Sequence, residues 1–183
     1  LELARLLVET CRSVDRPATA LVTDMSQPLG RWSGHAMEVR ESLDCLEGRG
    51  PTDLMTVTFE QCLAVATLAG HAVDRQQLES AVTSGHAREA FDLWAAAQGA
   101  ENSWLRAPQF DLAPEEVVLR AARSGVLAQV DTRSLGFVLA AAGASRVTGG
   151  SLDAGVSLNT IARLGDRVEA GQRFVQQKQV GLL

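Results

Sequence analysis

The sequence predicts an α/β unit followed by an α+β unit, and three observations support this fold class. An amphipathic helical pattern over about residues 1–14 leads directly into a short apolar stretch, residues 17–25, that is typical of a strand. Helical periodicity then continues through most of residues 36–98. Strand-like and helical segments alternate from about residue 114 onward. We therefore expect two domains, residues 1–113 and residues 114–183.

The first domain is predicted to begin with a helix, a strand and an unusual loop. The helix is indicated by apolar side chains at helical spacing, Leu3, Leu6, Leu7 and Cys11. Pro17 opens the apparent strand "PATALVTDM", and a helix–strand step is typical of α/β architecture. The stretch that follows, "TDMSQPLGRWSGHAMEVRE" over residues 23–41, contains two glycines, a proline and a tryptophan. Loops on a rigid scaffold frequently carry binding residues, so this loop is a candidate functional segment.

Apolar stripes and capping signals predict the helices that follow the loop. One stripe stops before the breaker residues Gly48 and Gly50, and consists of Ala36, Val39, Leu43 and Leu46. A second lies on a helix that ends at Gly99, and consists of Ala87, Phe91, Trp94 and Gln98. Two pairs have the spacing of a capping box and predict helix starts, Thr58 with Gln61 and Asp74 with Gln77.

The second domain is predicted to contain three strands and one helix. "SGVLAQVD", "GVSLNTIA" and "RFVQQ" have the composition of strands. "TRSLGFVLAAAG" is typical of a helix, with Thr132 as its N-cap and Gly143 at its end.

Composition and charge argue against several classes of protein. A net charge of -5 with a pI of about 5.2 gives no reason to expect nucleic acid or an anionic membrane as a partner. No apolar run approaches the roughly 20 residues of a membrane span, and no signal-peptide pattern opens the chain. Cys11, Cys45 and Cys62 lack CxxC spacing, so we expect reduced thiols and a cytoplasmic protein, with Cys11 and Cys62 buried.

Other motifs favour structural interpretations. His35, His71 and His86 show no metal-binding spacing and are expected at the surface or at helix ends. "GASRVTGG" lacks a phosphate-loop pattern and is interpreted as a turn. "LGDRVEAGQ" is similar to the turn of lipoyl or biotin carrier domains. A carrier needs a lysine at a hairpin tip, however, and Lys178 lies beyond the turn.

Glu38 and Glu41 are three residues apart on one predicted helix. Helical periodicity places them roughly opposite the apolar stripe. The default interpretation is a solvated acidic face, and a functional pair is the alternative.

The run "ALVTDMSQPLGRWSGHAMEVRESLDCLEGRGPTDL" resembles the thymidine phosphorylase and pyrimidine-nucleoside phosphorylase family. "GVLAQVDTRSLGFVLAAAGASR" and "LNTIARLGDRVEAGQ" resemble the C-terminal α+β domain of that family. The resemblance extends over nearly the whole chain. It implies the later part of a phosphate-binding α/β domain followed by a truncated C-terminal domain. The helical pattern at the first residue likewise suggests the later part of a longer protein.

The resemblance implies a pentosyltransferase that uses phosphate as co-substrate. Such an enzyme reversibly converts thymidine or another pyrimidine nucleoside to the free base and a (deoxy)ribose 1-phosphate. The family's phosphate loop and base-binding residues have no match in this chain, so we assign no catalytic or substrate-binding residue here. The complete enzyme is expected to be a homodimer, whereas this chain alone is expected to be inactive and monomeric. The rival interpretation is a non-catalytic relic or interaction module of the same fold.

One site of the family does fall within this chain. Related enzymes hold a potassium ion between the phosphate loop and the segment that matches residues 29–41. The matching ligands are the backbone carbonyls of Leu29 and Trp32 and the carboxylate of Glu41. A hard cation takes oxygen ligands, and carbonyl ligands tolerate any side chain, including the tryptophan.

Overall fold

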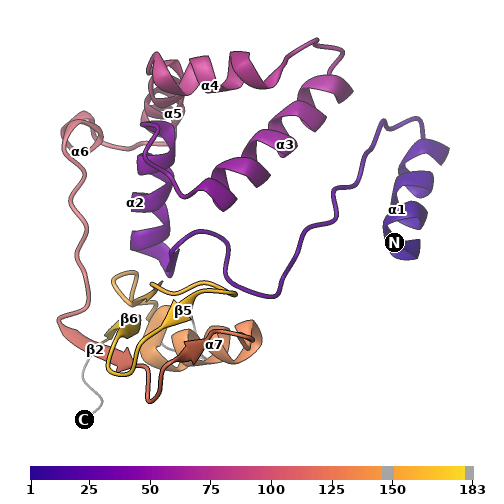
Figure 1. The fold of residues 1–183 in the computed structure, drawn as a ribbon. Helices are drawn as coiled ribbons and strands as arrows, with labels where there is room; N and C mark the ends of the chain where they lie inside the picture. Colours follow the sequence, from indigo (N-terminus) through magenta and orange to yellow (C-terminus); the bar gives the residue numbers. More distant parts are fainter. Residues whose placement is uncertain (146–150, 180–183) are drawn as a thin grey trace.

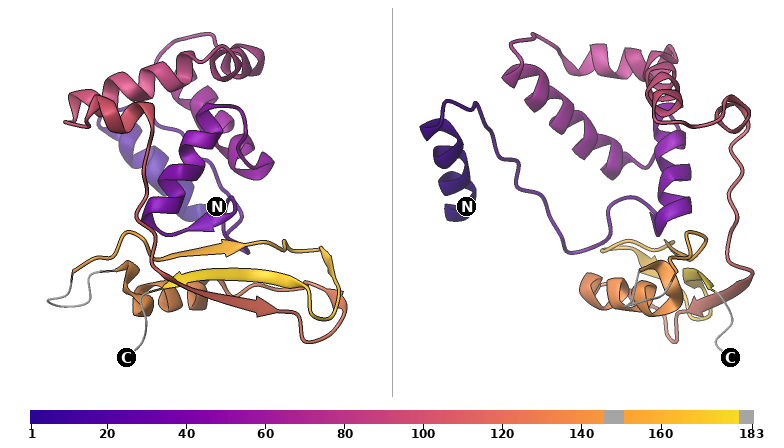
Figure 2. Two further views of the ribbon diagram at one scale, coloured as in Figure 1. Left: turned by 90° about the vertical axis from the view of Figure 1, so that its left-hand side faces the viewer. Right: turned by 180° about the vertical axis from the view of Figure 1, so that it is seen from behind.

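The computed structural model describes residues 1–145 and 151–179. Within these ranges the chain forms a helical part, a strand-rich part and a separate first helix (Figure 1). Helices α2 to α6 lie together, and the strands lie beside α7 at the other end of the molecule. Helix α1 stands apart at the end of an extended segment, and the view from behind shows the same arrangement (Figure 2).

The elements have the following bounds. The helices are α1 (Glu2–Ser13), α2 (His35–Leu46), α3 (Thr52–Leu68), α4 (Arg75–Thr83), α5 (His86–Ala97), α6 (Asn102–Arg106), α7 (Thr132–Leu139) and the π-helical turn η1 (Ala140–Ala144). The strands are β1 (Trp32–Ser33), β2 (Glu115–Arg120), β3 (Gly125–Val126), β4 (Ser157–Thr160), β5 (Arg167–Val168) and β6 (Arg173–Gln179).

Two antiparallel sheets organise the strand-rich part. One has the strand order β1-β4-β6-β2, and β3 pairs with β5 in the other. Strand β1 comes from the loop after residue 23 and lies at an edge of the larger sheet, where Trp32 is opposite Asn159. This short edge strand joins the loop to the C-terminal strands. The predicted domain boundary falls in the extended segment between α6 and β2 and stays a prediction.

Buried apolar side chains form two groups. In the helical part they are Leu43, Phe59, Ala95 and Leu105. In and beside the larger sheet they are Ala113, Val156, Leu158, Ala162 and Val175. The loop between residues 23 and 35 therefore runs between two small cores.

The predicted strand at residues 17–25 is wrong, because this stretch has no regular structure. A strand needs a hydrogen-bonded neighbour, and an apolar run does not specify one. Leu21 and Val22 are 48% and 68% exposed. The mixed helix-and-sheet class is confirmed, but the helix–strand step that predicted it does not form.

The helix predictions succeed where apolar periodicity supports them. Helices α1, α2, α4 and α5 lie where expected, and Asp74 and Gln77 form the predicted capping box. The predicted helix start at Thr58 is wrong, since α3 begins six residues earlier at Thr52. Thr58 instead donates its hydroxyl to the carbonyl of Leu54 at 2.8 Å, as threonines inside helices commonly do.

The C-terminal elements are predicted in part. "GVSLNTIA" and "RFVQQ" contain β4 and β6, while "SGVLAQVD" forms only the two-residue β3. Strand β2 and helix α6 were not predicted. Helix α7 ends at Leu139 and continues as η1, in which Gly143, the predicted helix end, has a φ of 109°. Its N-cap is Asp131 instead of Thr132, because the Asp131 carboxylate accepts the Ser134 N–H.

No helix in the described part of the chain is long and apolar enough to cross a membrane. The three cysteines are free, as predicted. Cys62 is exposed, which contradicts its predicted burial, and Cys11 and Cys45 are half-buried. Cys62 lies on a face of α3 that nothing covers in the described structure.

Candidate functional site

The candidate loop is held at several points by segments distant in the sequence. Arg31 accepts the Thr160 N–H at its carbonyl, at 2.8 Å, which continues the β1–β4 ladder. The Gln27 side chain accepts the Leu164 N–H at 3.0 Å. The Ala36 N–H donates to the Ala154 carbonyl at 3.0 Å. The loop is therefore a fixed junction between the helical part and the larger sheet.

Glu41 is buried beneath this loop, with only 6% of its surface exposed. Its carboxylate accepts the Arg31 N–H at 2.9 Å and, at a longer 3.4 Å, the Trp32 N–H. The default interpretation of a solvated acidic face is therefore wrong for Glu41. Helical periodicity had placed the side chain away from the apolar stripe, but the loop folds over that face and covers it.

Burial raises the pKa of Glu41 above its usual value. The backbone N–H groups of Arg31 and Trp32 lower it, and the negative charges of Asp53 and Glu38 raise it further. The backbone donors thus offset only part of the cost of burying a charge. A cation beside Glu41 would favour the ionised carboxylate.

Most backbone N–H groups at the turn of the loop donate hydrogen bonds to acidic side chains. Besides the two N–H groups bound to Glu41, the Gly30 N–H donates to Asp53 at 3.3 Å. The Gly34 N–H donates to Glu38 at 2.8 Å. Three carboxylates therefore fix the backbone between residues 30 and 34, and Glu38 as well as Glu41 turns toward the loop.

The two glycines of the loop are required by close approaches. Gly30 has a φ of +72°, and a Cβ there would lie 2.4 Å from the Glu41 carboxylate. Gly34 has a φ of +120°, and a Cβ there would lie 2.4 Å from the Val156 carbonyl oxygen. A side chain at either position would displace the loop from Glu41 or from the sheet.

The predicted cation ligands are brought together in part. Trp32 and Glu41 line the same hollow of about 420 Å³, whereas Leu29 lines a neighbouring one. The Arg31 carbonyl accepts a hydrogen bond from the Thr160 N–H, and Trp32 is opposite Asn159, so Trp32 occupies a non-hydrogen-bonded position of the antiparallel ladder. In a regular ladder the carbonyl of such a residue points away from the paired strand, on the same side as its N–H, which here donates to Glu41.

The side chains of the described residues do not by themselves form a metal site. No group of three His, Cys, Asp or Glu side chains within the described residues is arranged to hold a metal ion. Any cation here would need backbone carbonyl ligands in addition to Glu41. The buried carboxylate and the outward Trp32 carbonyl fit a hard cation that takes oxygen ligands.

Comparison with known proteins shows which proteins this chain is similar to. The chain is 36% identical over 179 residues to a thymidine phosphorylase of Burkholderia cenocepacia (strain HI2424). The matched region covers 93% of this chain and 41% of the relative. It is also 32% identical over 180 residues to a pyrimidine-nucleoside phosphorylase of Bacillus subtilis (strain 168). This match covers 95% of the chain and 42% of the relative. No family model matches.

The chain is homologous to these phosphorylases. The resemblance predicted from the sequence is thereby confirmed. The chain spans about two fifths of the length of these relatives and matches the C-terminal portion of the phosphorylases.

Two residues beside the loop were not predicted as site residues, although both lie in runs that resemble the phosphorylase family. Arg163 lies after β4, and Asp53 lies in the first turn of α3. Their side chains form an ion pair, and both also contact the Gly30 peptide. No local motif contains both residues, so only the two resembling runs, which end in "GPTDL" and contain "ARLGD", could have drawn attention to them.

The structure gives no functional role to the other motifs that were considered in the sequence, as far as they lie within the described residues. His35 contacts the Ala144 carbonyl at 2.8 Å, and His86 contacts the Ser84 hydroxyl at 3.0 Å. Lys178 lies within β6 and not at a hairpin tip, which disfavours a carrier domain. Most of "GASRVTGG", residues 146–150, lies outside the described residues.

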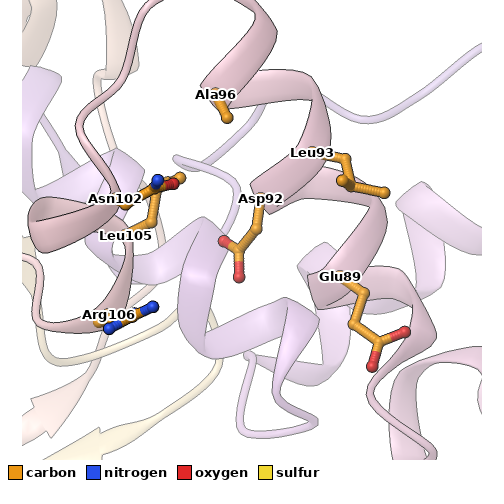
Figure 3. A pocket seen from close by; sticks show the side chains of 7 residues that line it. All are labelled: Glu89, Asp92, Leu93, Ala96, Asn102, Leu105 and Arg106. Atoms are coloured by element: carbon orange, nitrogen blue, oxygen red, sulfur yellow. The ribbon is translucent and has the colours of Figure 1, made fainter.

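A separate pocket of about 460 Å³ lies between α5 and α6, away from the loop. Figure 3 shows Asp92 pointing into the space between these helices, with Arg106 on the facing helix and Glu89 pointing away. None of the predicted ligands lines this pocket. We therefore place the candidate site at the loop.

Proposed function

We propose that this chain is the C-terminal segment of a pyrimidine-nucleoside phosphorylase. The complete enzyme would catalyse the reversible phosphorolysis of thymidine to thymine and 2-deoxy-α-D-ribose 1-phosphate, in nucleoside salvage in the cytoplasm. The observation that carries this proposal is the 36% identity over 93% of the chain to a protein named thymidine phosphorylase. The rival interpretation of a non-catalytic relic is not favoured, since the homologues of this chain are named as phosphorylases.

Within that enzyme, residues 1–113 would complete the phosphate-binding α/β domain. Residues 114–183 would belong to its C-terminal α+β domain. The loop that joins the helical part to the sheet supports this assignment, because it would place both domains beside the phosphate loop. Positioning of two substrates between domains is an effective source of catalysis.

We propose that the loop contributes to a potassium site in the complete enzyme. The Glu41 carboxylate and the carbonyls of Trp32 and Leu29 would be its ligands from this chain. The burial of Glu41 and the position of Trp32 in the ladder support these two ligands. The ion would supply positive charge that orders the loop near phosphate; it would take no part in bond breaking.

A chimaeric enzyme tests the proposed function. The matching C-terminal portion of the Burkholderia relative is replaced by this chain, and thymine release from thymidine is followed with and without phosphate. We expect phosphate-dependent release from the chimaera and none from the 183-residue chain alone. A chimaera that folds, as judged by circular dichroism, but releases no thymine contradicts the proposal. Thymine release by the chain alone contradicts its assignment as a partial enzyme.

A further inference from the structure

We propose that Asp53 and Arg163 are positioning residues that together hold the Gly30 peptide against Glu41. Neither residue is predicted to touch a substrate or an ion. The contacts of Asp53 and Arg163 with the Gly30 peptide are present in this chain. Only its consequence for a bound cation rests on the proposed function.

The two side chains grip the Gly30 peptide from both sides. Arg163 donates through Nη1 to the Gly30 carbonyl at 2.5 Å and through Nη2 to Asp53 Oδ2. The same Asp53 oxygen accepts the Gly30 N–H at 3.3 Å. The Arg163 side chain is 16% exposed and the Asp53 side chain 38%, so these contacts are partly shielded from water. Charge-assisted hydrogen bonds of this kind are stronger than neutral ones.

The position of Gly30 fixes the position of Glu41. The left-handed Gly30 backbone leaves no room for a side chain beside the Glu41 carboxylate. The next two N–H groups, of Arg31 and Trp32, donate to that carboxylate. A shift of the Gly30 peptide would therefore move both donors away from Glu41.

The grip also connects the two parts of the molecule. Asp53 belongs to α3 in the helical part, whereas Arg163 follows β4 of the larger sheet, 110 residues later in the sequence. Arg163 is itself fixed, because its N–H donates to Asp166 at 2.8 Å. Movement of the sheet relative to α3 would therefore be transmitted to the loop through Arg163.

Amide hydrogen exchange of the complete 183-residue chain tests this inference. In Arg163→Ala, we expect the amides of residues 30–32 to exchange roughly tenfold faster, since the loop loses charge-assisted contacts. Arg88→Ala is the matched control. Arg88 is 17% exposed, forms ion pairs with Glu47 and Asp92, and also donates to a backbone carbonyl, that of Leu105. Its loss should speed exchange around α5 and α6 and leave the loop unchanged.

Two further variants separate positioning from general stabilisation. Arg163→Lys retains the charge but cannot span both partners, so it should give an intermediate increase in exchange. Asp53→Asn should also speed exchange in the loop. If Arg163→Ala lowers the melting temperature but leaves exchange at residues 30–32 unchanged, the pair is merely a stabilising contact and the proposal is overturned. If Arg163→Ala does not fold, amide exchange at residues 30–32 in Arg163→Lys and Asp53→Asn decides instead. Unchanged exchange in both variants would overturn the proposal.

A potassium titration of melting temperature in the chimaera gives the second readout. If the parent chimaera responds to potassium, Arg163→Ala should lose the response and Arg88→Ala should keep it. An equal response in both variants overturns the positioning role toward the ion. A parent chimaera that does not respond contradicts the potassium proposal alone, since the exchange experiment still tests the grip on Gly30.

Discussion

At the scale of single residues, Glu41 is the point where charge, burial and loop geometry meet. A carboxylate that is 6% exposed requires compensation, and two backbone N–H groups supply part of it. Its pKa is raised, with burial as the first cause. A bound cation would complete the compensation. The chemistry of this one side chain therefore gives the sharpest test of the site.

We predict that Glu41→Gln removes a potassium-dependent rise in the melting temperature of the chimaeric enzyme. The amide keeps the shape of the side chain but removes the only formal negative charge among the three ligands from this chain. Glu38→Gln is the control, because Glu38 binds the Gly34 N–H and is not a predicted ligand. It should keep the potassium response even if it lowers the melting temperature. Equal responses of the parent and Glu41→Gln to potassium, with sodium as the reference salt, would exclude Glu41 as a ligand.

Cys45 gives a pH-dependent prediction. Burial raises the pKa of its thiol to about 11, and the charges of Glu41 and Asp44 add to the shift. The unfolded chain therefore loses this proton before the folded chain does, and stability should fall as the pH rises from about 9 toward about 11. We expect a loss of at most about 1 kcal/mol near pH 10, after allowance for partial solvent exposure. Urea unfolding of Cys45→Ala should show a shallower pH dependence over this window.

Cys62 is the reference for the burial of Cys45, since it is exposed on α3. Cys62 should react with a thiol reagent well before Cys45 does in the folded chain. Faster modification of Cys45 than of Cys62 would contradict the burial on which the prediction rests.

At the scale of elements, the sequence predicts what local interactions determine. The Asp74 capping box forms because its partners are three residues apart, and apolar stripes place α2 and α5. The contacts that build the site are not local. Glu41 becomes buried only because β1 pairs with β4, and Asp53 meets Arg163 across 110 residues. Periodicity holds no information on such pairings, so the site was predicted only through family resemblance.

Two similar sequence signals provide a test of helix capping. Asp74 accepts the Gln77 N–H at 2.8 Å, so Asp74→Ala should lower the free energy of unfolding by about 1 kcal/mol. Thr58 has the same spacing from Gln61 but lies exposed inside α3. Thr58→Ala should change the free energy of unfolding by about 0.5 kcal/mol or less. Urea unfolding checks both values, and a larger loss at Thr58 than at Asp74 would contradict the observed start of α3.

The junction of β1 and α2 depends on Gly34. A Cβ at this position would lie 2.4 Å from the Val156 carbonyl oxygen and 2.8 Å from Ser157 Cα, both backbone atoms. We expect Gly34→Ala to cost about 3 kcal/mol, from backbone strain and from the separation of β1 and β4. Gly70→Ala is the control, because Gly70 also has a positive φ, of 78°, but has nothing within 4 Å. It should cost only about 1 kcal/mol. Equal losses in thermal unfolding would mean that the close approach to β4 is not required.

At the scale of the whole molecule, α1 contributes little to either core. No residue of α1 is buried, and Leu3, Leu6 and Leu7 are 67%, 57% and 57% exposed. The helix stands away from the rest of the molecule in Figure 1 and in the view from behind in Figure 2. Three leucines at helical spacing form an apolar face that the described structure leaves uncovered. Such faces commonly mark contacts with other protein segments.

We predict that the isolated chain is a monomer or a weak associate that binds an apolar dye through α1. Leu6→Gln and Leu7→Gln should lower dye fluorescence and any concentration-dependent light scattering, because each removes exposed apolar surface. Thr10→Gln is the control, as it changes an exposed polar residue of the same helix. Obligate dimer interfaces are large and apolar, and three exposed leucines on one separate helix form too small a surface for one. A tight, stoichiometric dimer at low concentration, or dye binding unaffected by both leucine variants, would contradict this prediction.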